Sequence, residues 1–153
     1  MKYRTLDEIR PVAEVVPIGP TARMLRRQRL ERFATVLDQY KGPLRLLSRI
    51  EYLPESERPS LRSDFSPLTV AFQDPVLRGQ GLAGDRLGDA IEFFDLSQHE
   101  AHHLFCDCHY AASITPPTVS ARVRTIASRL TFGEVWARLS GAVRSWMSGG
   151  RRW

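Results

Sequence analysis

Apolar residues recur at helical spacing along much of this chain, between polar segments rich in proline and glycine. The segment 22–41 places four of them on one helical face: Leu30, Phe33, Leu37 and Tyr40. Thr21 is expected to cap this helix at its start, and Gly42-Pro43 is expected to end it. The pattern therefore predicts an amphipathic first helix.

Shorter and less regular elements are expected next. A second helix is predicted through Leu44, Leu47 and Ile50, ending before Pro54, and the irregular region 53–85 follows. Within that region, Ser-Pro and Asp-Pro pairs each combine a capping side chain with proline at the first helical position. The segments LTVAFQ and VLRGQ are therefore predicted as short helices, with a strand over LTVAF as the alternative.

Capping signals mark four later helix starts. Asp85 is expected to cap a helix that ends near Phe94, and Ser97 with Glu100 forms the capping-box pattern S-x-x-E. The other two starts are Thr115-Pro116, with Val119, Val123, Ile126 and Leu130 facing inward, and a second capping box, Thr131 and Glu134. Gly149-Gly150 is expected to end the last helix.

These elements together predict an all-α fold, a single-domain bundle of about six short helices. The helical domain is expected to span residues 21–148. An extended N-terminal arm with three prolines would precede it over residues 1–20, and a flexible C-terminal tail would follow over residues 149–153.

Composition narrows the class of protein further. A chain of 153 residues with 42% apolar and 25% charged residues suits one folded domain. No stretch approaches the roughly 18 apolar residues of a membrane span, and acidic residues stand where a signal peptide needs an apolar run. Two cysteines one residue apart do not make a disulfide framework. We therefore expect a soluble, cytoplasmic protein with reduced thiols.

Charge is unevenly distributed along the chain. Counting charged side chains gives +5 over residues 1–52, −6 over residues 53–110 and +6 over residues 111–153. Packing of the basic ends against the acidic middle is the favoured interpretation, and two basic surfaces for a polyanion are the alternative.

All four histidines and both cysteines lie in the eleven-residue segment HEAHHLFCDCH, residues 99–109. Imidazole and thiolate are the side chains that bind zinc and other soft divalent metals. His99, His103 and Cys106 follow at helical spacings of four and three, so they are expected to share a face. Cys108 and His109 follow, and the set His103, Cys106, Cys108 and His109 offers zinc two sulfurs and two nitrogens. Without a metal, both cysteines would act as small buried apolar residues.

Residues 99–103 also match H-E-x-x-H, and His109 extends the match toward the longer metzincin pattern. Over these eleven residues the chain resembles the metzincin motif. That resemblance implies a zinc-dependent hydrolase in which His99, His103 and His109 bind zinc and Glu100 is the general base. Cys106 stands where the motif has glycine, and the capping box gives Glu100 a structural role, so an enzyme is the alternative and not the favoured class.

Two segments are candidates for partner binding. The first helix carries Arg23, Arg26, Arg27, Arg29 and Arg32 near its N-terminus, where cations oppose the helix dipole, so a nucleic-acid-binding protein is a second alternative. The C-terminal segment holds all three tryptophans, and Trp136, Arg138 and Trp146 are typical interface anchors. The favoured function is a small helical binding or regulatory module that contacts a protein partner or itself through this helix. For the His/Cys segment of that module, a metal site and buried cysteines without a metal both stay open.

Overall fold

Every regular element in the part of the chain that the structure describes is helical. The computed structural model describes residues 22–111 and 113–129. The predicted arm, the C-terminal helix with Trp136, Arg138 and Trp146, and the tail 149–153 lie outside the described residues.

Six α-helices and three 3₁₀ turns make up the described residues. The α-helices are α2 (Arg26–Gln39), α3 (Pro67–Gln73), α4 (Pro75–Gly79), α5 (Leu87–Phe94), α6 (Gln98–Phe105) and α7 (Pro116–Ala127). The 3₁₀ turns are η2 (Ile50–Tyr52), η3 (Arg58–Ser60) and η4 (Asp107–His109). The all-α prediction is therefore confirmed.

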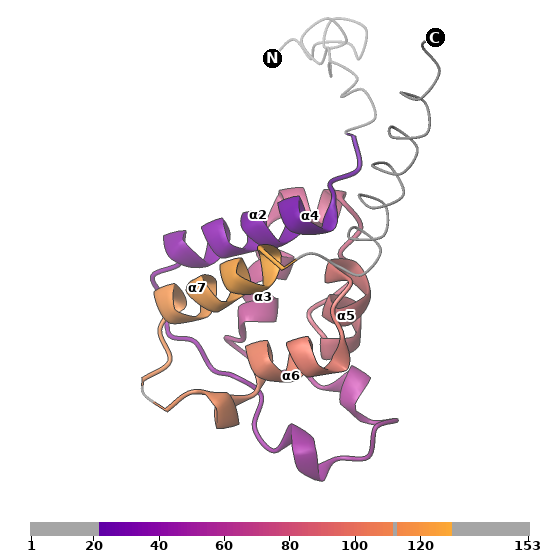
Figure 1. Cartoon of the computed structure of the whole chain (residues 1–153), viewed down its shortest axis with the longest axis vertical. Coiled ribbons are helices and arrows are strands. Elements are labelled where there is room, and N and C mark those ends of the chain that lie inside the picture. The colour runs from indigo at the N-terminus through magenta and orange to yellow at the C-terminus, as the bar shows by residue number, and fades with distance from the viewer. Residues whose placement is uncertain (1–21, 112, 130–153) are drawn as a thin grey trace, which may run out of the picture.

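Helices α2 and α7 lie side by side, with α3 and α5 in contact with α2 and α6 in contact with α7 (Figure 1). The buried residues of α2 include Leu30, Phe33 and Leu37, and those of α7 include Val119 and Val123. These are the apolar stripes that the sequence predicts. Each helix thus turns one face toward a shared core and the opposite face toward solvent.

Phe33 occupies the centre of that core. Its ring stacks on Phe94 of α5 at 5.1 Å between centroids and lies 6.4 Å from Phe105 of α6. All three rings are fully or almost fully buried. Because aromatic rings contribute large apolar areas, this trio fixes the position of α6 against α2.

The predicted caps of the short helices are present. Ser66 accepts a hydrogen bond from the backbone N–H of Thr69 at 3.1 Å, and Asp74 accepts one from Leu77 at 3.1 Å. Thr115 caps α7 in the same way. Proline at the first position of each helix completes these starts, so LTVAFQ is a helix and not a strand.

The predicted second helix through Leu44, Leu47 and Ile50 is wrong, since the structure has only the 3₁₀ turn η2 in that stretch. Leu47 instead lies on an extended segment and forms a parallel bridge with Cys106, and Arg49 adopts a left-handed φ of 58° that would interrupt a helix. Burial of Leu46 and Leu47, which are adjacent in sequence, stabilises this segment without a helical stripe.

Two predicted helix starts also need correction. The first helix begins at Arg26 with Leu25 as its cap residue, and Thr21, the expected cap, lies outside the described residues. Helix α5 begins after Arg86, whose N–H donates to Asp89 at 3.2 Å. Asp85 instead accepts hydrogen bonds from Arg62 and Thr69, because the chain turns before the helix starts.

No helix within the described ranges is long and apolar enough to cross a membrane.

Candidate metal centre

The candidate metal centre is built around the end of α6. This helix begins with the predicted capping box: Ser97 Oγ accepts from the N–H of Glu100 at 3.1 Å, and Glu100 Oε2 accepts from the N–H of Ser97 at 2.9 Å. Its apolar face, Ala101, Leu104 and Phe105, is buried in the core. The opposite face carries the histidines.

Glu100 is fully occupied by structural contacts. Its second carboxylate oxygen, Oε1, accepts a hydrogen bond from Arg26 at 3.1 Å. Burial acts to raise the pKa of Glu100, but the Ser97 N–H and the Arg26 charge outweigh it and hold that pKa below its usual value. Both oxygens therefore have structural partners, one at the start of α6 and one on α2, whereas the metzincin resemblance would need a carboxylate that is free to activate water.

The extended segment before η2 brings a distant residue to the end of α6. The N–H of Leu47 donates to the carbonyl of Phe105 at 2.8 Å, and the N–H of Asp107 donates to the carbonyl of Leu47 at 3.0 Å. The left-handed turn at Arg49 then starts η2, in which buried Ile50 anchors the backbone. Glu51 consequently lies over the end of α6, although 55 residues separate it from Cys106.

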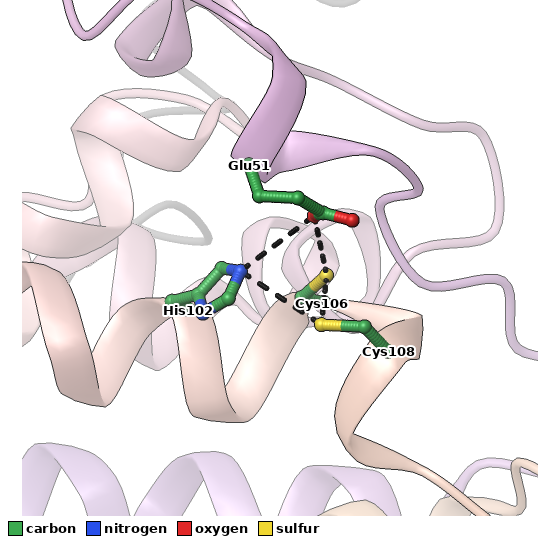
Figure 2. A group of neighbouring side chains, drawn as sticks. All are labelled: Glu51, His102, Cys106 and Cys108. Atoms are coloured by element: carbon green, nitrogen blue, oxygen red, sulfur yellow. Dashed lines mark hydrogen bonds and ion pairs between the residues drawn. The ribbon is translucent and has the colours of Figure 1, made fainter.

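Four side chains meet at this point: Glu51, His102, Cys106 and Cys108 (Figure 2). Their four candidate ligand atoms all lie within 4.8 Å of one another. Glu51 Oε2 is 3.8 Å from His102 Nε2 and 3.7 Å from Cys106 Sγ, and His102 Nε2 is 3.8 Å from Cys108 Sγ. We call these four residues the metal cluster.

The donor atoms of the metal cluster suit zinc. Tetrahedral zinc with usual bond lengths places a sulfur and a nitrogen ligand about 3.6 Å apart, and a nitrogen and an oxygen ligand about 3.3 Å apart. The distances of 3.8 Å from His102 to Cys108 and to Glu51 lie within about half an ångström of these values. The two sulfurs, 2.7 Å apart, would have to separate to about 3.8 Å. The set therefore fits zinc after a small movement of one thiol.

A second histidine orients the first. His109 Nε2 lies 3.0 Å from His102 Nδ1 and is placed to share a hydrogen bond with it. This contact leaves His102 Nε2 directed toward the other members of the metal cluster, the arrangement by which outer partners fix metal-binding imidazoles. Arg122 of α7 donates to the carbonyls of His103 and His109 and packs 3.8 Å above the Tyr110 ring, so α7 holds the η4 turn in place.

The two cysteines differ sharply in environment. Cys106 is fully buried, whereas Cys108, which the sequence places among the core contacts, is exposed. Burial, with added effects from Cys108 and Glu51, raises the pKa of Cys106 to about 12. A metal ion bound beside this thiol would favour its thiolate form, because the ion's positive charge would offset the burial and the nearby carboxylate.

The other predicted ligands lie beside the metal cluster. The rings of His99 and His103 stack at 6.3 Å, and the His103 ring is 4.8 Å from that of His109. Burial and the nearby Arg122 charge lower the pKa of His103, and burial, His102 and Arg122 lower the pKa of His109. The structure thus brings Cys106 and Cys108 together, places His109 behind His102, and leaves His99 and His103 on the neighbouring surface.

Sequence reasoning missed Glu51 and His102. His102 stands four residues before Cys106, the same spacing that singled out His99 and His103, so this candidate ligand was recognisable. Glu51 had no local signal, since only the Leu47–Cys106 pairing brings it near.

Most arginines of α2 bond to residues in the acidic segment 53–110. Arg26 is buried and bonds both Glu100 and the carbonyl of Asp95. Arg32 makes two hydrogen bonds to buried Asp74, at 2.6 and 3.1 Å. Arg29 donates to the carbonyl of Phe93, and exposed Arg27 pairs with Glu31 one turn away. Internal pairing therefore accounts for Arg26 and Arg32, while Arg23 is exposed ahead of the helix.

Replacing Arg26 with methionine should lower the free energy of unfolding by about 2–3 kcal/mol, because Glu100 would lose its charged partner in a half-buried site. Arg27→Met is the matched control, since an exposed pair one turn apart contributes only about 0.3–0.5 kcal/mol. Urea unfolding followed by circular dichroism measures both. Equal losses in the two variants would contradict the structural role of Arg26.

Comparisons with protein-family models, with curated protein sequences and with solved structures find no match to this chain. Arguments about its function therefore rest on its own residues.

Proposed function

We propose that this protein is a zinc-binding helical module whose metal ion is held by Glu51, His102, Cys106 and Cys108. One observation carries the proposal: four donor atoms from two distant segments lie within 4.8 Å of one another. Two thiols and an imidazole select zinc over magnesium or calcium, which prefer oxygen ligands.

A zinc ion in this position would have a structural role. Four protein ligands complete a tetrahedral shell, as in structural zinc sites, whereas catalytic sites keep one position for water. The ion would join η2 to the end of α6, in a part of the chain where most of the backbone is irregular. It would thereby stabilise the surface formed by residues 44–60 and 106–110, which a binding or regulatory module could present to a partner.

The hydrolase alternative has less support. It needs His99, His103 and His109 as ligands and Glu100 as base, but Glu100 is bonded to Ser97 and Arg26. The two sets of ligands share no histidine, since the metal cluster uses His102. A single pair of histidine variants therefore separates the two functions.

Zinc titration of the full chain, purified without a histidine tag, tests the proposal. With a competing chelator, wild-type protein should bind one zinc ion, and Cys106→Ser or His102→Gln should weaken binding about 100-fold or more. His109→Gln should weaken it about 10- to 100-fold, because it removes only the partner that orients His102.

His99→Gln is the matched control and should leave zinc affinity unchanged. Absence of stoichiometric zinc in the wild type would refute the proposed function. A larger loss in His99→Gln than in His102→Gln would instead favour the hydrolase set of ligands.

A further inference from the structure

We propose that Cys106 and Cys108 are also a thiol–disulfide exchange site, which small disulfides such as oxidised glutathione convert to an internal disulfide. The exchange itself needs no metal. Its consequence, that the oxidised chain cannot hold zinc, rests on the proposed function.

The distance between the two sulfurs supports this pairing. Cys106 Sγ and Cys108 Sγ lie 2.7 Å apart, between the roughly 2.05 Å of a disulfide bond and the roughly 3.8 Å of two thiolates on one zinc ion. The two sulfurs would therefore have to move by only about an ångström to form a disulfide or to bind one zinc ion. Two thiols held this close favour internal closure over reaction with a second protein molecule.

Differences in exposure set the order of events. Cys108 is exposed and Cys106 is fully buried, so a reagent in solution reaches Cys108 first. Cys106 is held in place because the backbone on either side of it pairs with Leu47. Cys108 is thus the attacking residue and Cys106 the resolving residue.

The exchange balances in two steps. The Cys108 thiolate attacks one sulfur of the small disulfide RSSR, which forms a mixed disulfide Cys108–S–S–R and releases RS⁻. Cys106 then passes its proton to the Glu51 carboxylate, to which its thiol donates at 3.7 Å, and attacks Cys108 Sγ, which breaks the bond to the R group and releases a second RS⁻. The two protein thiols have lost two electrons and two protons, and RSSR has become two RSH.

Zinc and the disulfide compete for the same sulfurs. A disulfide sulfur carries no negative charge and is a poor zinc ligand, so closing the Cys106–Cys108 bond would leave only Glu51 and His102. Bound zinc should in turn protect both thiols from exchange. The metal cluster would then bind zinc in a reducing environment and release it in an oxidising one.

Mass spectrometry of the full chain tests the exchange. Metal-free wild-type protein treated with excess oxidised glutathione and then alkylated should lose both free thiols and retain no glutathione. Cys106→Ser should retain one glutathione on Cys108. Cys108→Ser should react about tenfold or more slowly than Cys106→Ser, because its remaining thiol is buried. In urea this difference should disappear.

A wild-type chain that accumulates bound glutathione or disulfide-linked dimers would overturn the inference, and equal rates for the two serine variants would overturn the assigned order. Zinc titration of oxidised and re-reduced protein separates the two proposals. If the reduced protein binds no zinc, the proposed function is refuted, but the proposal of an exchange site at Cys106 and Cys108 is not affected. Zinc binding without an internal disulfide refutes only the exchange.

Discussion

An alanine in place of Phe33 is expected to lower the free energy of unfolding by about 3–5 kcal/mol. Phe33 is fully buried and contacts the rings of Phe94 and Phe105, so truncation removes its own apolar burial and leaves a cavity between three helices. A domain of ordinary stability has only about 5–15 kcal/mol in total. Urea unfolding followed by circular dichroism should therefore show a midpoint far below that of the wild type.

Phe65→Ala is the matched control for this change. Phe65 is 58% exposed, so the same truncation at this position should cost no more than about 0.5 kcal/mol. Similar losses in the two variants would show that Phe33 does not form the centre of the core. Zinc affinity in Phe33→Ala should also fall, because the cavity loosens α6 against α2.

Local signals accounted for most of the helices. Ser66, Asp74, Ser97 and Thr115 each cap the helix that the sequence assigns to them, because capping depends only on residues three positions apart. The buried stripes of α2 and α7 were recognisable for a similar reason, since helical periodicity is a property of the segment itself. Helix positions that depend on neighbours in sequence could thus be predicted.

The segment 44–50 shows where local reasoning fails. Its leucines fit a helical stripe, yet Leu47 gains two backbone hydrogen bonds from the chain at the end of α6. Those bonds, with burial of Leu46 and Leu47, outweigh a weak helical propensity next to Gly42 and Pro43. Pairing with a segment more than fifty residues away leaves no mark in the local pattern.

The candidate metal site was likewise predictable where it depends on local sequence and not where it depends on contacts between distant segments. Concentration of histidine and cysteine in residues 99–109 pointed to the right segment. Which histidine faces the sulfurs depends on where α6 ends, because Cys106 leaves the helix with extended backbone and turns its side chain inward. Glu51 arrives only through the fold. The residue types were therefore predictable, but the set that meets in space was not.

Zinc at about a thousandfold excess over its dissociation constant should raise the free energy of unfolding of the wild-type chain by up to about 4 kcal/mol. Three of the cluster's ligands lie within seven residues, from His102 to Cys108, so the unfolded chain retains some affinity and the gain should fall below that value. Cys106→Ser should lose the gain, whereas His99→Gln should keep it. Glu51→Gln is the most informative variant, because it removes the one ligand that only the folded chain brings to the others. In this variant the rise in the free energy of unfolding with zinc should become smaller, even if one zinc ion still binds. Urea unfolding with zinc and with a chelator measures each difference, and an equal gain in Cys106→Ser and the wild type would place the zinc elsewhere.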